Sequence, residues 1–243
     1  MTNDNRSGAI AIFVKTPGLS PIKTRLAETI GKSAAQDFYR LSVAATRAQV
    51  RKLVEYDPTL TPYWAIAELD ALNHEMWSGC AQVAQGEGNL GQRLAHVYNE
   101  VLKQHSFVLL VGADAPHLPY ANLISAAESL RQKDHPPDDV PSFVLGRCDD
   151  GGFYVIGGNI SIPVSVWLEV PYSATDTADK MRDALCRFGA VAELPQSFDI
   201  DTEGDLKKLA QITFNEQTLL PEQLAVYRWA KYQIGSRAGA LAE

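Results

Sequence analysis

Several signatures that would assign this chain to a familiar protein class are missing from its 243 residues. It has only three cysteines, Cys80, Cys148 and Cys186, which are far apart and form no Cys-x-x-Cys pair. This spacing favours reduced thiols over a disulfide framework. No apolar run approaches the roughly 20 residues that a membrane-spanning helix needs. Residues 1–8 are polar and lack the apolar region of a signal peptide. We therefore expect a soluble, cytoplasmic protein without a membrane partner.

Concentrated positive charge is missing as well. The formal net charge is −7, and no block of lysine and arginine stands out. We therefore expect no nucleic-acid partner, and we expect any anionic ligand to be bound by a few local cations. The Gly-x-Gly-x-x-Gly pattern of dinucleotide-binding folds and the Gly-x-Ser-x-Gly pattern of hydrolases are absent. The five histidines show no metal-ligand spacing, and only His117 lies near Asp114, as a candidate acid or base.

Apolar runs that alternate with amphipathic segments organise the chain. The most apolar run, 107–112, is expected to be a central strand because both of its faces must be buried. Residues 142–157 are typical of two antiparallel strands around a short Asp-Gly loop, and 133–141 of a polar, proline-rich surface loop. Strands are predicted at 9–14, 63–67, 80–84, 107–112, 142–146, 153–157 and 190–194, and helices at 38–48, 90–101, 123–130, 178–188, 206–210 and about 221–235.

This order of elements predicts the fold class. Strands alternate with helices over the first two-thirds of the chain, and no internal repeat, low-complexity tract or domain boundary is visible. We expect one domain over residues 1–243, with a three-layer α/β fold and a mostly parallel, mixed sheet. The segment 38–48 is expected to pack on the sheet through Phe38, Leu41, Ala45 and Ala48.

The loop after the first predicted strand carries candidate ligand-binding residues. Lys15 directly follows the strand 9–14, and Lys23 and Arg25 come after Gly18 and two prolines, just before helical sequence. A strand that runs into a cationic loop of this kind suits a phosphate-bearing ligand at the carboxyl edge of a sheet. An ordinary strand-to-helix connection with solvated lysines is the alternative.

Three aspartates follow predicted strands further along the chain. Asp114 comes after the most apolar strand, and Asp199 and Asp201 occupy alternate positions of an extended segment, so that their side chains point the same way. Carboxylate oxygens are suitable ligands for Mg²⁺ or Mn²⁺. Together with the three cations they predict a metal–diphosphate site. In the alternative interpretation Asp114 caps the next helix, and the other two belong to a turn before a capping box of Thr202 and Asp205.

The segment Asp149-Asp150-Gly151-Gly152 is a further candidate. Its glycines permit a tight turn whose backbone can approach a ligand closely. Asp150 would then hydrogen-bond a sugar hydroxyl or orient an acceptor. A simple turn without a ligand is the alternative.

The ordered set of motifs resembles a family of bacterial transferases of the GT-A (nucleotide-diphospho-sugar transferase) superfamily, described as arsenosugar-biosynthesis or radical-SAM-associated glycosyltransferases. The sequence has Ser20-Pro21 where Pro-Gly is expected, and Asn89 where aspartate is common. The matching segments extend over residues 9–210 in the family's order. They are Phe13-Val-Lys15-Thr-Pro17 with Lys23-Thr-Arg25-Leu26, Gly88-Asn-Leu-Gly91-Gln-Arg93, Gly112-Ala-Asp114-Ala-Pro116, Leu145-Gly146 through Asp150-Gly-Gly-Phe-Tyr154, and Asp199-Ile-Asp201-Thr202-Glu-Gly-Asp205-Leu206.

The resemblance implies a three-layer α/β/α, Rossmann-like GT-A fold and a metal-dependent transferase that moves a glycosyl group from a nucleotide-sugar to a small acceptor. Distant similarity to phospholactate and molybdenum-cofactor guanylyltransferases leaves two alternatives open: a nucleotidyltransferase that releases pyrophosphate, and a non-catalytic nucleotide-binding protein. The base, sugar, acceptor and oligomeric state are not specified by the sequence. The implied metal ligands for Mg²⁺ or Mn²⁺ are Asp114, Asp199 and Asp201, the nucleotide-binding residues Lys15, Lys23, Arg25, Gly91 and Arg93, and the catalytic residues Asp114, Asp150 and Lys23.

Overall fold

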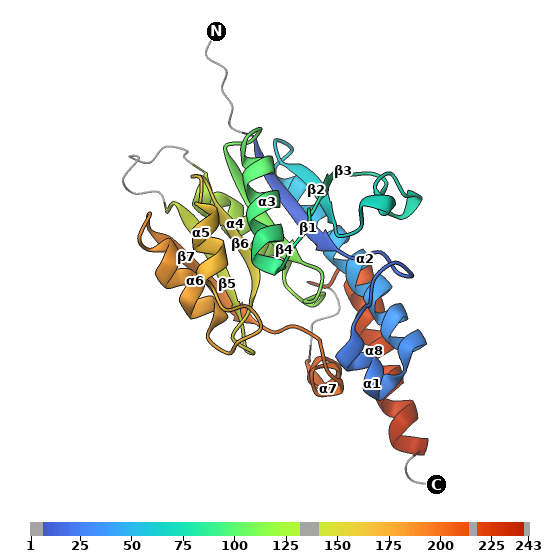
Figure 1. Ribbon diagram of the computed structural model, residues 1–243. Helices are drawn as coiled ribbons and strands as arrows, with labels where there is room; N and C mark the ends of the chain where they lie inside the picture. The colour runs from blue at the N-terminus through green and yellow to red at the C-terminus, as the bar shows by residue number, and fades with distance from the viewer. Residues whose placement is uncertain (1–6, 132–140, 214–217, 241–243) are drawn as a thin grey trace.

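The computed structural model describes residues 7–131, 141–213 and 218–240. Their strands are β1 (Gly8–Val14), β2 (Thr61–Ile66), β3 (Ala81–Ala84), β4 (Phe107–Gly112), β5 (Phe143–Cys148), β6 (Phe153–Gly158) and β7 (Val191–Ser197). They form one seven-stranded sheet in the order β3-β2-β1-β4-β6-β5-β7 (Figure 1). β6 is antiparallel to both of its neighbours, and the other pairings are parallel. The predicted mixed, mostly parallel sheet is confirmed.

The centre of the sheet is buried on both faces. β4 is the fourth strand in the order, as its continuous apolar run predicts. In the neighbouring β1, Ile10 and Ile12 belong to the core on one face, whereas Ala9 and Ala11 belong to the core on the other. This alternation follows from the two-residue period of a strand.

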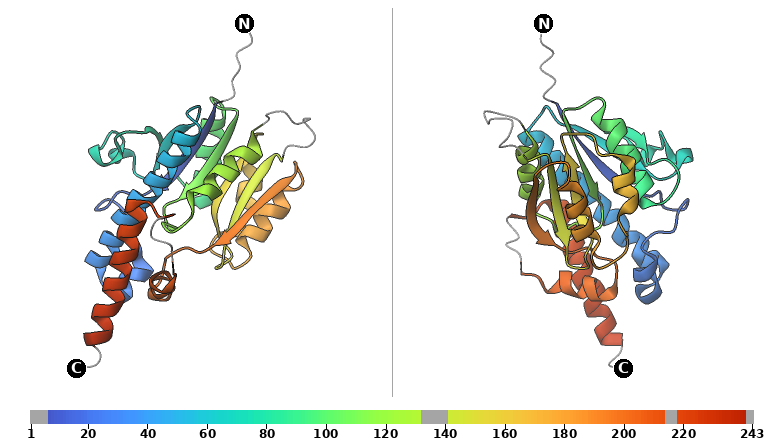
Figure 2. Two further views of the ribbon diagram at one scale, coloured as in Figure 1. Left: turned by 180° about the vertical axis from the view of Figure 1, so that it is seen from behind. Right: turned by 60° about the vertical axis from the view of Figure 1, so that its left-hand side comes forward.

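Helices form a layer on each face. The helices are α1 (Thr24–Ile30), α2 (Lys32–Tyr56), α3 (Leu90–Leu102), α4 (Tyr120–Leu130), α5 (Val164–Glu169), α6 (Thr177–Leu185), α7 (Glu203–Gln211) and α8 (Pro221–Ala240). α3, α5 and α6 cover the face that is turned to the viewer in Figure 1. α2 and α4 cover the opposite face, which is seen from behind in Figure 2. Among the described residues, no helix combines the length and the apolar character needed to cross a membrane.

A third core cluster extends the molecule beyond the carboxyl ends of β1 and β4, where α1, α2, α7 and α8 meet (Figure 1). Phe38 and Ala45 of α2 pack there, with Leu41 against them, rather than on the sheet. The sheet is instead contacted by Tyr39 and Val43. The predicted packing of Phe38, Leu41 and Ala45 was therefore wrong, because α2 lies between the sheet and α8 and is buried on two sides.

The remaining differences from prediction concern short elements. α6 ends at Leu185, so Phe188 lies outside the helix and is 43% exposed. α5 and two 3₁₀ helices, Leu69–Ala71 and Glu75–Trp77, carry too little periodicity to be predicted. β7 runs three residues beyond the predicted end at 194. In the predicted surface loop 133–141, residues 133–140 lie outside the described residues.

Candidate active site at the carboxyl edge of the sheet

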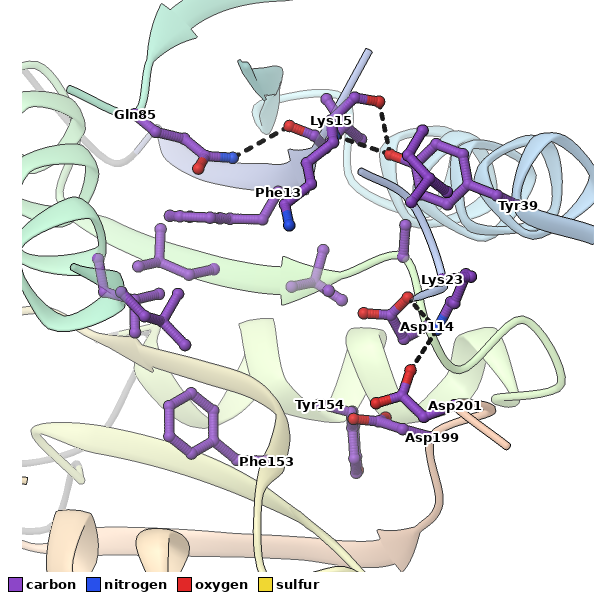
Figure 3. A pocket seen from close by; sticks show the side chains of 18 of the residues that line it. Phe13, Lys15, Lys23, Tyr39, Gln85, Asp114, Phe153, Tyr154, Asp199 and Asp201 are labelled. Carbon is purple, nitrogen blue, oxygen red and sulfur yellow. Dashed lines mark hydrogen bonds and ion pairs between the residues drawn. The ribbon is translucent and has the colours of Figure 1, made fainter. Parts of the chain in front are cut away.

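Parallel strands place the residues that follow them at one edge of the sheet, and a cavity of about 510 Å³ lies there (Figure 3). This is the edge at which open α/β sheets bind ligands, and the volume suits a small molecule. The charged residues that line it come from the ends of β1, β4 and β7 and from the start of α1. They are Lys15, Lys23, Arg25, Asp114, Asp199 and Asp201.

The Lys23 ammonium group joins two of the aspartates. Its Nζ lies 2.6 Å from Oδ1 of Asp114 and 2.7 Å from Oδ1 of Asp201, and it donates to the carbonyl of Ile200 at 2.8 Å. The backbone N–H of Ile200 in turn donates to the carbonyl of Asp114 at 3.0 Å. We call Lys23, Asp114, Asp199 and Asp201 the carboxylate cluster. Its members are separated by up to 178 positions in the sequence, and Lys23 contacts Asp114 and Asp201 directly.

Burial and backbone conformation single out Lys23. Only 4% of its side chain is exposed. Burial alone would lower its pKa, but the charges of Asp114 and Asp201 outweigh burial and raise the pKa above its usual value. Lys23 also has φ 45° and ψ 48° at the start of α1, a left-handed conformation that disfavours residues with a Cβ. The contacts of its ammonium group offset this strain, which is typical of functional sites.

Asp199 is the half-buried carboxylate of the cluster that does not contact Lys23. The Cys148 thiol donates to its Oδ1 at 3.1 Å. Burial, followed by the negative charge of Asp114, raises the pKa of Asp199 to about 7. Burial and the Asp199 charge also raise the pKa of Cys148, so the thiol stays protonated and acts as a donor. Two carboxylates thus share the Lys23 ammonium group, and Asp199 is instead bonded to the Cys148 thiol.

Two buried glutamines form hydrogen bonds with the loop that carries Asp114. Gln49 of α2 donates its side-chain amide to the carbonyls of Pro116 and Leu118 at 2.8 and 2.9 Å. Gln223 of α8 donates to the same two carbonyls at 2.9 Å. The C-terminal helix therefore supports the position of Asp114 without lining the cavity.

Lys15 is fixed through its backbone. The Tyr39 hydroxyl accepts from the Lys15 N–H and donates to the Lys15 carbonyl, both at 2.8 Å. Burial raises the pKa of Tyr39, which keeps this hydroxyl protonated. The exposed Lys15 side chain extends over the cavity in Figure 3. Arg25, also exposed, lies in the first turn of α1. These two cations are open to a ligand, whereas Lys23 is engaged.

The other half of the cavity is apolar. It is lined by Phe13 of β1, Leu94 of α3, and Phe153 and Ile156 of β6. The rings of Phe13 and Phe153 enter from different strands of the sheet (Figure 3). The cavity therefore combines a charged half with a half that suits the less polar part of a ligand.

Gln85 closes this apolar half and was missed from the sequence. Its Nε2 donates to the carbonyls of Val14 and Ala65, at 3.1 and 2.8 Å. Arg93 lies 3.5 Å from its Oε1 and donates to the carbonyl of Gly88 at 3.0 Å. The available signal was that Gln85 directly follows β3, as Asp114 nearly follows β4; no comparable signal existed for Tyr39.

The structure does not bring Gly91 and Arg93 to the cavity lining. A Cβ on Gly91 would lie 2.7 Å from the Trp167 carbonyl and from the Tyr172 ring, so glycine is needed for helix packing. Asn89, where the family commonly has aspartate, begins α3 in a capping box with Gln92. Asparagine serves this role as well as aspartate does.

Asp150 also lies outside the lining. Its Oδ1 accepts from the Gly152 N–H at 2.9 Å. Gly151 has φ 91°, and a Cβ there would lie 2.0 Å from the Thr175 carbonyl oxygen. The close approach that Gly151 permits is made to Thr175, while the Asp150 carboxylate lies within 4.8 Å of that of Asp199.

His117, the candidate acid or base, lies outside the cavity lining. Its ring stacks on Phe198 at 4.0 Å, and its Nε2 lies 3.2 Å from the Ser197 hydroxyl. Burial, followed by the positive charge of Lys208, lowers its pKa to about 4. Because His117 does not line the cavity, its interpretation as an acid or base finds no support.

The donor set of the carboxylate cluster fits a hard divalent cation. Asp114 and Asp201 share one ammonium group, and Asp199, with its pKa raised to about 7, adds part of a third negative charge. A divalent cation would neutralise this excess of negative charge. Cys148, Asp150 and Asp199 also bring potential ligand atoms within 4.8 Å of one another. The protonated thiol is an unsuitable ligand for these cations, so we favour the cavity side of Asp199.

Comparison with solved structures defines the class of fold. A protein from Desulfovibrio desulfuricans G20, whose description as a nucleotide-diphospho-sugar transferase is provisional, is 24% identical and superposes with a TM-score of 0.79 over 94% of this chain and 97% of its own. The 4-diphosphocytidyl-2C-methyl-D-erythritol synthase from Anaerococcus prevotii DSM 20548 is 12% identical, with a TM-score of 0.50 over 83% and 93% of the two chains. Rv0371c from Mycobacterium tuberculosis H37Rv is 14% identical, with 0.50 over 83% and 96%. The expected GT-A-like α/β fold is confirmed.

The sequence also assigns the chain to a family. Residues 40–174, more than half of the chain, match the family described as uncharacterized proteins conserved in bacteria (DUF2064), and the chain belongs to this family. The matched region includes Asp114 and Asp150, whereas Lys23 and Asp201 lie outside it. No curated protein matches the sequence.

Proposed function

We propose that this protein is a metal-dependent transferase that uses a nucleotide-sugar donor to glycosylate a small acceptor, of the type associated with arsenosugar biosynthesis and radical-SAM enzymes. The observation that carries the proposal is the convergence of three carboxylates and three cations on one cavity. The GT-A-like fold supports it, because that fold is shared with a protein described as a nucleotide-diphospho-sugar transferase.

The charged half of the cavity would bind the donor diphosphate. Asp114, Asp199 and Asp201 would hold Mg²⁺ or Mn²⁺, which would neutralise the charge on the leaving nucleoside diphosphate. Lys15 and Arg25 would bind phosphate oxygens directly, because both line the cavity and both are exposed. Tyr39 would keep Lys15 in place through the two hydrogen bonds to its backbone.

The apolar half would receive the less charged part of the substrates. Phe13 and Phe153 offer ring faces and edges, and Leu94 and Ile156 complete a wall that excludes water from one side. Water exclusion strengthens the electrostatic interactions of the charged half and protects the donor from hydrolysis. Asp150, whose carboxylate lies within 4.8 Å of that of Asp199, would hydrogen-bond a sugar hydroxyl or orient the acceptor from beside the cavity.

A product-release assay tests the proposal. The protein is incubated with Mg²⁺ or Mn²⁺, a panel of nucleotide-sugars and nucleoside triphosphates, and a library of small hydroxyl-bearing acceptors. Acceptor-dependent release of nucleoside diphosphate from a nucleotide-sugar is the expected result. Asp114→Asn provides the matched inactive control.

Two other results would replace the proposal. Pyrophosphate release from a triphosphate would identify a nucleotidyltransferase. Tight nucleotide binding with no turnover across the panel would identify a non-catalytic nucleotide-binding protein.

A further inference from the structure

Lys23 occupies the space that a divalent cation bound by Asp114 and Asp201 would need. Its ammonium nitrogen lies within 2.7 Å of both carboxylates, and its third hydrogen bond goes to the Ile200 carbonyl. All three ammonium hydrogens are therefore used within the protein. In this arrangement Lys23 has no donor left for a phosphate, although it lines the cavity.

The ammonium group and a divalent cation would compete for the same two carboxylates. Lys23 already contacts Oδ1 of both, and a cation of charge +2 a few ångströms away would repel the buried ammonium group. Each of them alone partly neutralises the cluster.

We propose that Lys23 and the divalent cation are alternative occupants of the space between Asp114 and Asp201, and that the displaced Lys23 side chain then binds a phosphate of the ligand. This inference rests on the proposed function and adds the order of events. Before the cation binds, only Lys15 and Arg25 are open to a phosphate. After it binds, Lys23 joins them, so cation and diphosphate bind cooperatively.

Manganese titration of two matched variants tests the exchange. Lys23→Met keeps the length of the side chain and removes its charge, and Mn²⁺ affinity without nucleotide, followed by electron paramagnetic resonance, is expected to rise at least about tenfold. Lys15→Met removes a charge from the same cavity at a residue that does not pair with the carboxylates, and is expected to change the affinity less than about threefold. Thermal unfolding verifies that both variants are folded.

The wild-type chain offers a second measurement that needs no variant. Reductive methylation, quantified by mass spectrometry, is expected to leave Lys23 unmodified in metal-free protein, because its side chain is 4% exposed and fully hydrogen-bonded. Addition of Mg²⁺ is expected to make Lys23 reactive. Lys15, exposed throughout, is the internal control. If Lys23→Met does not fold, the methylation of Lys23 with and without Mg²⁺ tests the exchange by itself.

Each outcome has one consequence. The exchange is overturned if Lys23→Met leaves the Mn²⁺ affinity unchanged or lowers it, or if Lys15→Met raises it equally. It is also overturned if Mg²⁺ does not change the reactivity of Lys23. In these cases the metal role of the aspartates stands. No Mn²⁺ binding by any of the three proteins at millimolar concentration overturns both the exchange and the metal in the proposed function.

Discussion

Two groups of ion pairs in this protein differ in the burial of their cations and in their charge balance. On the outer surface, Arg147 of β5 lies 2.5 Å from Asp179 and 3.2 Å from Glu193, and Arg182 lies 2.7 Å from Glu193. We call these four residues the outer network. In it two arginines face two carboxylates, and the side chains of Asp179, Arg182 and Glu193 are 42–64% exposed. Water already stabilises such charges, so the network adds little.

The carboxylate cluster differs in its cation and in its charge balance, whereas its Asp114 and Asp201 side chains, 43% and 42% exposed, are as accessible as Glu193. Its lysine is almost fully buried, and its charges do not balance. Protein folding alone gives no reason to gather two carboxylates around one ammonium group with a third beside them, because like charges in a partly buried site repel. The imbalance is explained if the cluster is built to receive a further cation.

Substitution of a metal ligand is expected to have the largest effect. Asp114→Asn should weaken Mn²⁺-dependent nucleotide binding by at least about 100-fold while the protein stays folded, because loss of a ligand should exceed the 10–100-fold effects of residues that only orient ligands. Isothermal titration with Mn²⁺ and a nucleoside diphosphate measures it. Asp179→Asn in the outer network is the control and should bind normally. Equal Mn²⁺-dependent nucleotide binding by Asp114→Asn and wild type would show that the carboxylate cluster has no larger role in binding than the outer network.

Acidification is expected to act through His117, which lies behind the cluster. Its pKa of about 4 in the folded protein is below the unfolded value near 6.5, so the neutral ring stabilises the fold above pH 6.5, and this stabilisation is lost as the pH falls toward 4. Relative to His117→Gln, the wild type should lose about 1–3 kcal/mol of unfolding free energy between pH 7.5 and 4.5. Urea denaturation at several pH values measures it. A difference between the two proteins that stays constant with pH would refute the buried neutral ring.

Loss of one supporting glutamine is expected to be a smaller effect. Gln223→Leu should cost about 1 kcal/mol, because Gln49 still donates to the carbonyls of Pro116 and Leu118. The double variant with Gln49→Leu should cost more than the sum of the single ones, since both carbonyls then lose their donors. Additive costs in chemical denaturation would show that the two amides act independently.

The outer network provides the smallest expected effect. Arg147→Gln should change the unfolding free energy by less than about 1 kcal/mol, and less still in high salt, because exposed pairs are screened. Nucleotide binding should not change. If denaturation experiments show that Arg147→Gln lowers the unfolding free energy by several kcal/mol, the outer network stabilises the fold after all and the contrast with the carboxylate cluster fails.

Much of the fold was predictable because its signals are local. The apolar run of β4 placed that strand at the centre, and the Thr202–Asp205 capping box was confirmed at the start of α7. Packing between distant elements was not predictable. The two-sided burial of α2 depends on α8, which follows more than 160 residues later.

The candidate site was predictable as a set of residues at one edge of the sheet, and not as a set of contacts. Residues that follow parallel strands must meet there, which brought Lys15, Asp114 and Asp199 together. The pairing of Lys23 with Asp114 and Asp201 depends on a left-handed residue before α1, which no sequence pattern signals at a lysine. Gly91 was assigned to the nucleotide through the family resemblance, and the structure places it against Trp167 and Tyr172, outside the cavity lining.

The central claim is that the carboxylate cluster binds a divalent cation, and anomalous scattering tests it most directly. A crystal of the wild-type protein grown with Mn²⁺ and a nucleoside diphosphate is measured at the manganese absorption edge. The account predicts a peak about 2.1 Å from carboxylate oxygens of Asp114 and Asp201, with the Lys23 ammonium group displaced toward the phosphates. A manganese peak among Cys148, Asp150 and Asp199, or no peak while Lys23 stays between Asp114 and Asp201, would contradict it.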